Sequence, residues 1–252
     1  MADYAELSRR FQDALGMKGA PVGFYYANDK PDGALGFKGV RRGSCIVALA
    51  YQASTERPAA FDKDTHGCPG AGRFLGFKTE VRKYFAEFLS CGFEDVVEGE
   101  RYIKTPALAK IKIERQRLRQ APARYAVFSP LDKLPAGVEP EVVIFFAPPD
   151  VLSGLVVLAD YDNERPDSNT VVRFSSGCGQ IVAEPLAELA TDTPRALLGM
   201  FDPSARPQVP RDVLSYAIPR PLFLHMADNI DGSFLQTETW QVVKKRIAKQ
   251  TA

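Results

Sequence analysis

Apolar residues recur along the chain at two spacings, and the spacing separates candidate helices from candidate strands. Tyr4, Leu7, Phe11 and Leu15 stand three or four residues apart, which predicts an amphipathic helix. Gly16 follows them and is typical of a helix end. Similar patterns predict further helices over residues 45–52, about 79–90, 105–119, 150–159, from about 181, about 221–227 and about 236–248.

Short runs of β-branched and aromatic residues between turn residues predict the strands. These runs cover residues 21–27, 124–128, 142–146, 170–174 and 214–218. Strands and helices interleave without a regular βαβ period, so we expect an α+β fold with a mixed sheet and packed helices. A chain of 252 residues can bury its own core. We expect residues 1–252 to form a single compact domain or two intimate halves.

Charge and composition argue against several classes of partner. The chain has 32 lysines and arginines against 31 acidic residues, so no strong field of one sign attracts nucleic acid. Its apolar runs are far shorter than the roughly 18 residues of a membrane span. The first residues include Asp3 and Glu6 and no apolar segment follows, which argues against a secretory signal. We therefore expect a cytoplasmic protein with reduced thiols that binds neither nucleic acid nor membranes.

Three of the four cysteines stand in glycine-rich turns or at helix starts. Cys45 follows Ser44, which we expect to cap a helix, while Cys68 and Cys178 have glycine neighbours. The glycines we single out as ligand-binding candidates are Gly70, Gly72, Gly177 and Gly179. Helix starts and glycine turns direct backbone N–H groups toward a sulfur or an anion and favour the thiolate. Each cysteine alone fits simple packing, but the three together indicate a functional site.

The fourth cysteine and the two histidines carry weaker signals. Cys91 stands beside Gly92 at the end of a predicted helix and fits packing or a helix cap. His66 lies in a polar loop near Cys68 and is expected to be solvated more often than bound to a metal. His225 lies in an apolar run and is expected to pack in the core. Cys91 and His66 remain less certain metal ligands.

Basic residues supply candidates for an anion site. Arg42 and Arg73 are close to the cysteine turns and are candidates for holding an anionic ligand or offsetting the charge of a metal cluster. The denser basic face of the helix predicted over 105–119 is expected to be solvated. The glycine-rich segment 67–72 lacks the Lys-Ser/Thr pair of a phosphate loop, so nucleotide binding receives little support from motifs.

The order of these motifs resembles the uncharacterised ArCR proteins, domain of unknown function 169. The segments that carry the resemblance are 21–23, 45–50, 68–72, 75–76, 128–131, 178 and 218–219. The family pattern after the second cysteine is similar to Cys-x-Gly-Gly, whereas here Ala71 separates the two glycines. The resemblance implies that Cys45, Cys68 and Cys178 are family cysteines and that Cys91 is not, and it implies no particular activity.

Three or four thiolates on glycine-rich turns suit an iron–sulfur cluster, and we expect the four-iron, four-sulfur type. Cys91, His66 or a small molecule would fill the fourth position. Two alternatives stay open: a protein that binds a small anion without metal, and a thiol-dependent enzyme that uses Cys45 or Cys68 with His66. The substrate, the redox partner, catalytic turnover and assembly into a homo-oligomer all stay open from sequence.

Overall fold

The computed structural model of the protein describes residues 2–40, 43–78 and 80–250. Its framework is one seven-stranded sheet. The strands are β1 (Val22–Ala27), β2 (Ala59–Phe61), β3 (Tyr125–Pro130), β4 (Val142–Ala147), β5 (Thr170–Val171), β6 (Ala196–Gly199) and β7 (Leu214–Pro219). They are arranged in the order β2-β3-β1-β4-β7-β6-β5, and only the β5–β6 pair is parallel. The expected α+β fold with a mixed sheet is confirmed.

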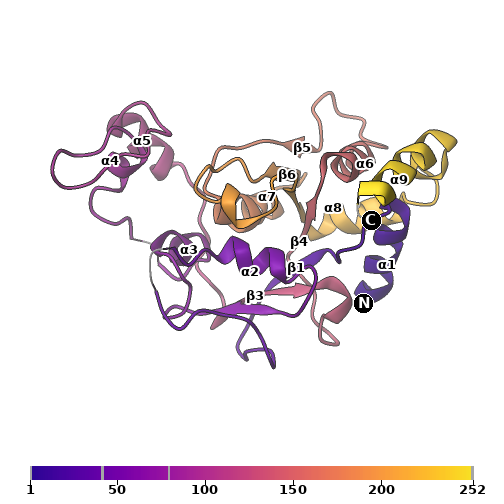
Figure 1. The fold of residues 1–252 in the computed structure, drawn as a ribbon, viewed down its shortest axis with the longest axis horizontal. Helices are drawn as coiled ribbons and strands as arrows, with labels where there is room; N and C mark the ends of the chain where they lie inside the picture. Colours follow the sequence, from indigo (N-terminus) through magenta and orange to yellow (C-terminus); the bar gives the residue numbers. More distant parts are fainter. Residues whose placement is uncertain (1, 41–42, 79, 251–252) are drawn as a thin grey trace.

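Helices cover both faces of this sheet (Figure 1). One face packs against α1 (Tyr4–Leu15), α6 (Pro149–Ala159), α8 (Arg220–Asp228) and α9 (Glu238–Gln250). The other packs against α2 (Ile46–Gln52), α3 (Pro69–Phe74), the π-helix η2 (Gly179–Ala183) and α7 (Glu184–Leu189). Short 3₁₀ helices are formed by Leu131–Lys133, Arg206–Gln208 and Phe234–Gln236.

The central strand β4 explains the longest apolar run of the sequence. Val142 and Ile144 face the core beneath α2 and α3, whereas Val143 and Phe145 face the core beneath α1 and α8. All six residues of β4 are buried. A strand covered on both faces loses the alternation of polar and apolar residues, and the sequence shows this pattern.

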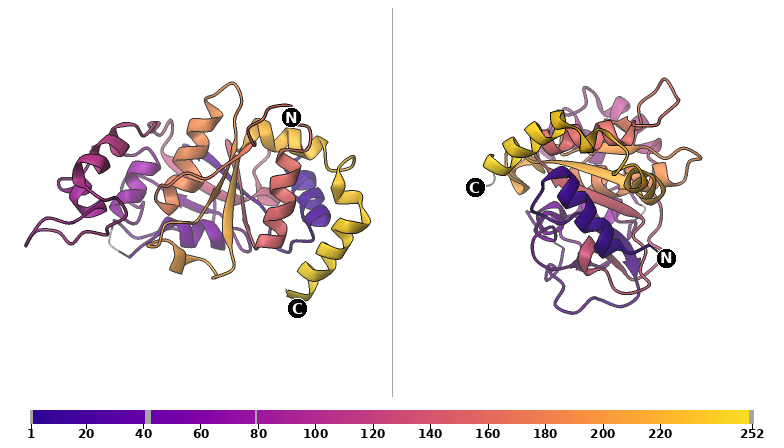
Figure 2. Two further views of the ribbon diagram at one scale, coloured as in Figure 1. Left: turned by 90° about the horizontal axis from the view of Figure 1, so that it is seen from above. Right: turned by 90° about the vertical axis from the view of Figure 1, so that its right-hand side faces the viewer.

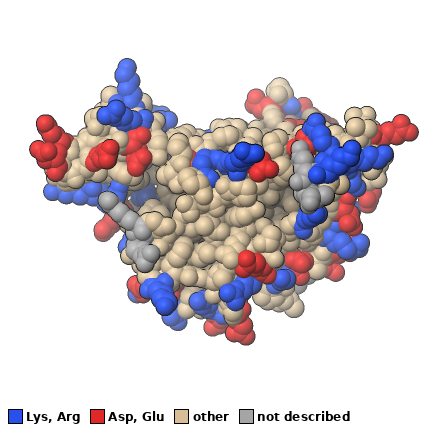
Figure 3. Space-filling view, in the orientation of Figure 1, with Lys and Arg blue, Asp and Glu red and all other residues tan. Residues whose placement is uncertain are grey.

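A small lobe projects from one end of the molecule, opposite the C-terminal helix (Figure 2). It contains α4 (Phe85–Leu89) and α5 (Pro106–Glu114), which pack around their own apolar cluster of Ala86, Ile103, Ala109 and Ile113. At the base of the lobe the Ala121 N–H donates to the Gly76 carbonyl at 3.0 Å, which joins the two connecting segments. Charged side chains gather on the lobe and at the opposite end, whereas the face between them carries few (Figure 3).

Several predicted element boundaries are wrong. The helix predicted over 79–90 is reduced to α4, because Tyr84 adopts a left-handed conformation with φ +62°; its predicted start, Thr79, lies outside the described residues. The helix predicted to reach Arg119 ends at Glu114. The strand predicted over 170–174 shrinks to β5, because the chain leaves the sheet toward Cys178. Strands β2 and β6 were not predicted.

Within the part of the chain that the structure describes, no helix has both the length and the apolar character to span a membrane.

Close packing between α6 and α9 generates a test of the fold. A Cβ atom at Gly154 would lie 2.5 Å from Cη2 of Trp240 and 2.9 Å from Cδ2 of Leu15. We expect Gly154→Ala to lower the free energy of unfolding by about 1–3 kcal/mol in urea denaturation, because overpacking outweighs the roughly 1 kcal/mol that alanine gains within a helix.

Val157→Ala is the matched control, since Val157 lies on the exposed side of α6 and should change stability by less than about 0.5 kcal/mol. A Gly154→Ala protein as stable as the unmodified chain would contradict this packing.

Candidate functional site

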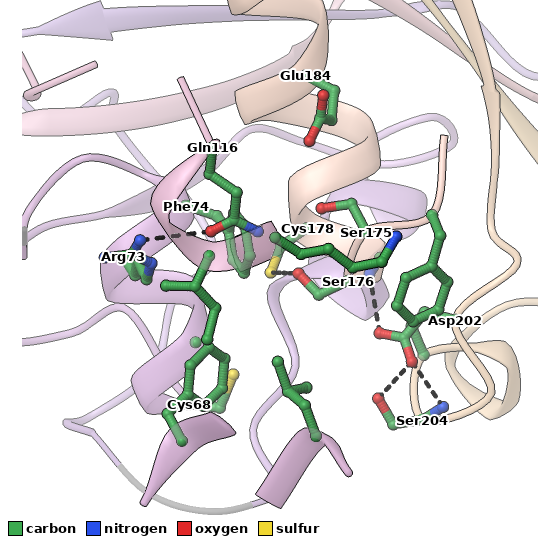
Figure 4. A pocket seen from close by; sticks show the side chains of 18 of the residues that line it. Cys68, Arg73, Phe74, Gln116, Ser175, Ser176, Cys178, Glu184, Asp202 and Ser204 are labelled. Carbon is green, nitrogen blue, oxygen red and sulfur yellow. Dashed lines mark hydrogen bonds between the residues drawn. The ribbon is translucent and has the colours of Figure 1, made fainter. Parts of the chain in front are cut away.

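A cavity of about 1500 Å³ lies between the lobe and the body of the protein, and Cys45, Cys68 and Cys178 all line it. Cys45 immediately precedes α2, Cys68 precedes α3 and Cys178 precedes the π-helix. Figure 4 shows Cys68 and Cys178 among the side chains that line this cavity. Three segments that are distant in sequence therefore deliver three cysteines to one wall.

Backbone contacts join the first two cysteine turns. Cys45 itself, rather than Ser44, is the N-cap of α2, so the predicted cap is wrong. The Ser44 carbonyl instead accepts a hydrogen bond of 2.9 Å from the Cys68 N–H. Gly67 has φ +74°, and a Cβ atom there would lie 2.4 Å from this carbonyl oxygen. Only glycine permits such a close approach without displacing the Cys45 turn.

A buried carboxylate holds the third cysteine turn. Asp202 accepts hydrogen bonds from the Gly177 N–H at 2.9 Å and from the N–H and hydroxyl of Ser204 at 2.9 and 2.8 Å. The Ser176 hydroxyl lies 3.2 Å from the Cys178 sulfur and accepts from the Gly179 N–H. Figure 4 shows the contacts of Asp202 with Ser204 and of Ser176 with Cys178. The sequence analysis did not identify Asp202, whose Asp-x-Ser spacing is a recognisable turn signal.

A second buried side chain supports the same turn from the π-helix. The Gln180 side-chain oxygen accepts from the Met200 N–H at 2.7 Å and the Phe201 N–H at 3.2 Å, and its amide nitrogen donates to the Arg173 carbonyl. Met200 has φ +70°, a conformation that non-glycine residues rarely adopt. Gln180 therefore stabilises the strained backbone that leads into Asp202.

The pKa values of two thiols on this wall, Cys45 and Cys178, are raised, so both thiols are neutral at neutral pH. Burial raises the pKa of Cys45 to about 11; the N–H groups of Val47 and Ala48 act in the opposite direction, and Cys68 raises the pKa further. Burial also raises the pKa of Cys178, as do Cys68 and Cys45, while its hydrogen bond with Ser176 lowers it. The expectation that a helix start lowers the Cys45 pKa is wrong, because burial outweighs the N–H groups. The mutual effects show that the three sulfurs are electrostatic neighbours.

The two less certain ligands do not line the cavity. Cys91 is exposed on the lobe, with its sulfur 3.6 Å from the Gly92 carbonyl. His66 is completely buried, which contradicts the expected solvated position, and its Nδ1 lies 3.0 Å from the Cys68 carbonyl. Burial lowers the His66 pKa. His66 thus supports the backbone of Cys68 and does not itself line the cavity.

The other histidine also differs from its prediction. His225 is exposed, and its Nε2 lies 2.9 Å from Asp162 Oδ1. The apolar residues around it in the sequence belong to the buried side of α8, whereas His225 lies on the outer side.

The candidate glycines divide into two groups. Gly70 and Gly177 line the cavity. Gly72 packs against the His66 ring, where a Cβ atom would approach to 2.6 Å, and a Cβ atom at Gly179 would lie 2.2 Å from the Ser175 hydroxyl. The latter two glycines permit close packing behind the cysteine wall.

Basic residues reach the cavity from both sides. Arg73 lines it, and its Nη2 donates to Gln116 Oε1 of the lobe at 3.4 Å (Figure 4). Arg42 lies outside the described residues. Lys112, Arg115 and Arg117, which the sequence analysis assigned to a solvated face, also line the cavity. Helical spacing alone does not reveal that this face borders a cavity between lobe and body.

The fold and the site define an α+β protein with three cysteines on one wall of a large cavity. A family model described as uncharacterised ArCR, domain of unknown function 169, matches residues 10–229. The match covers most of the chain, so the protein belongs to this family and the resemblance of motifs is confirmed. No curated protein and no solved structure matches the chain.

The raised pKa of Cys45 generates a test by alkylation. In metal-free protein, we expect labelling of Cys45 by iodoacetamide to rise about tenfold per pH unit and to continue rising above pH of about 9, because only the thiolate reacts. Glutathione in the same sample should level off near its lower pKa. Mass spectrometry of peptides measures each site, and labelling of Cys45 at neutral pH as fast as glutathione would contradict the assignment.

The role of Asp202 generates a test of stability. We expect Asp202→Ala to lower the free energy of unfolding by about 2–4 kcal/mol, because the Gly177 and Ser204 donors lose a buried charged acceptor. Asp212→Ala is the matched control, because Asp212 is exposed and its substitution should change stability by less than about 0.5 kcal/mol. Equal urea midpoints for the two variants would contradict the role of Asp202.

Proposed function

We propose that the protein binds an iron–sulfur cluster of the four-iron, four-sulfur type through Cys45, Cys68 and Cys178. The observation that carries this proposal is the convergence of these three cysteines on one cavity wall. Among the described side chains, no three of histidine, cysteine, aspartate and glutamate are grouped to hold a single metal ion. A cluster does not require such a group, since each cysteine binds a separate iron atom.

The surroundings of the sulfurs fit ligation as thiolates. The N–H groups of Val47 and Ala48 favour the charged form of Cys45, and the Ser176 hydroxyl favours that of Cys178. Donors of this kind stabilise the sulfur ligands of a metal centre and tune its properties. The raised thiol pKa values mean that iron must displace protons from these cysteines on binding, so loading would depend on pH.

The fourth position of the proposed cluster would face the cavity. Cys91 and His66 do not line the cavity, and both Asp202 oxygens already accept hydrogen bonds from Gly177 and Ser204. We therefore assign the fourth position to a small molecule or solvent. When bound, such a cluster supplies electron transfer or a Lewis-acidic iron. The three cysteines would bind three of the four iron atoms, and the fourth iron would be open to a small molecule or a redox partner. We place the protein in the cytoplasm, where thiols stay reduced.

A thiol-dependent enzyme receives less support. A cysteine nucleophile needs a lowered pKa and a neighbouring base, but the pKa values of Cys45 and Cys178 are raised. The His66 Nδ1 lies against the Cys68 carbonyl instead of a sulfur.

Iron and acid-labile sulfide, measured on protein purified without oxygen, test the proposal. We expect near-stoichiometric loading and a broad visible absorption that are lost in Cys45→Ser, Cys68→Ser and Cys178→Ser. Cys91→Ser is the matched control, because Cys91 is exposed on the lobe, and it should retain both.

Circular dichroism of every variant shows whether lost iron reflects lost folding. The absence of iron and sulfide from the unmodified protein, both as isolated and after reconstitution with ferrous iron and sulfide, would overturn the proposal. Loss of the cluster in Cys91→Ser alone would overturn the assignment of ligands.

A further inference from the structure

The cavity has a second wall, which the cluster proposal does not use. Phe85 and Phe88 of α4, together with Tyr102, contribute aromatic surface from the lobe. The Phe85 and Phe88 rings stack with centroids 6.2 Å apart, and the Arg82 guanidinium lies 4.3 Å from the Phe88 centroid. This wall therefore combines flat apolar faces with positive charge.

An aromatic residue of the body approaches the same wall. The Phe174 ring lies 6.0 Å from that of Tyr102, at an interplanar angle of 64°. Phe174 also lines the cavity and is half-exposed. Exposed aromatic rings that line a concave site are suited to stacking against a ligand.

The charge of the cavity favours an anion. Basic side chains outnumber acidic ones among the described residues that line it. Two of the acids, Glu184 and Glu188, form ion pairs with Arg173, and Glu188 also pairs with Arg195. Lys112, Arg115 and Arg117 line the cavity, and none of the ion pairs formed by the described residues includes them. With Glu80, Glu100 and Asp202 counted as well, the lining still carries more basic than acidic side chains, so the cavity has an excess of positive charge.

We infer that this cavity binds a nucleotide-like ligand, an aromatic ring system that carries phosphate, between the lobe and the cysteine wall. The aromatic rings would stack against the base or its equivalent, and Arg115 and Arg117 would bind the phosphate. A cavity of about 1500 Å³ exceeds the roughly 300–1,000 Å³ typical for drug-sized ligands and suits a molecule of cofactor size. The inference goes beyond the cluster proposal and does not depend on it.

Flavin mononucleotide is the first probe, because its fluorescence reports binding and its ring and phosphate can be separated chemically. We expect the full chain to bind flavin mononucleotide with a dissociation constant below about 1 mM. Riboflavin, which lacks the phosphate, and inorganic phosphate alone should each bind at least about tenfold more weakly. Adenosine monophosphate tests whether another aromatic base is accepted.

Matched variants assign the site. Arg115→Ala combined with Arg117→Ala should weaken binding about tenfold or more, and Phe174→Ala should weaken it as well. Lys104→Ala combined with Lys110→Ala is the control, because it removes the same charge from exposed positions of the lobe that do not line the cavity. This control should bind as the unmodified protein does.

Failure of both flavin mononucleotide and adenosine monophosphate to bind, or equal weakening by the two double variants, would overturn the inference. Iron and sulfide are measured on the same preparations, and binding is repeated with Cys45→Ser. Nucleotide binding without iron would overturn the cluster proposal alone, whereas iron without nucleotide binding would overturn only the ligand inference.

Discussion

The buried carboxylate of Asp202 is the interaction on which the candidate site depends. It accepts hydrogen bonds from the turn that carries Cys178 and from Ser204 in its own loop, and so fixes the turn to the segment that follows β6. A buried carboxylate is stable only when such donors satisfy it. Gln180 completes the arrangement by accepting from Met200 and Phe201. This network holds the turn in the position from which Cys178 lines the same cavity as the other two cysteines.

The sheet supplies the rigid frame for this network. Strands β4, β7 and β6 are paired side by side, and the loop after β6 carries Asp202 to the end of the sheet nearest the lobe. On the same face, α2 and α3 pack with the π-helix in one apolar core, which places Cys45 and Cys68 beside Cys178. The bond from the Cys68 N–H to the Ser44 carbonyl then fixes their separation. Tertiary packing, rather than any local motif, assembles the three cysteines.

The sequence predicted those parts of the fold that local pattern determines. Helix α1 has strong periodicity and strand β4 is a continuous run of apolar residues, so their residues alone indicate them. Strands β2 and β6 have three and four residues, which is too short for a periodic signal. The prediction of a solvated His66 is wrong because its burial depends on the contact with Gly72. That contact is made only in the folded chain. For the same reason, glycine spacing did not distinguish Gly70, which lines the cavity, from Gly179, which packs behind it.

The metal-free and the metal-loaded forms of the proposed site would differ in charge at the cysteine wall, because the thiols of Cys45 and Cys178 are protonated without metal. Three thiolates in one buried wall would repel one another and lose solvation, so the metal-free protein keeps Cys45 and Cys178 neutral. Loading with iron would replace those protons and concentrate sulfur ligands and metal charge at one end of the cavity. The cations of Arg115 and Arg117 belong to the lobe, which has its own small core. A phosphate bound there would lie on the lobe's side of the cavity, away from the electron-rich sulfurs, so the two proposed ligands can occupy one cavity without competing for the same charges.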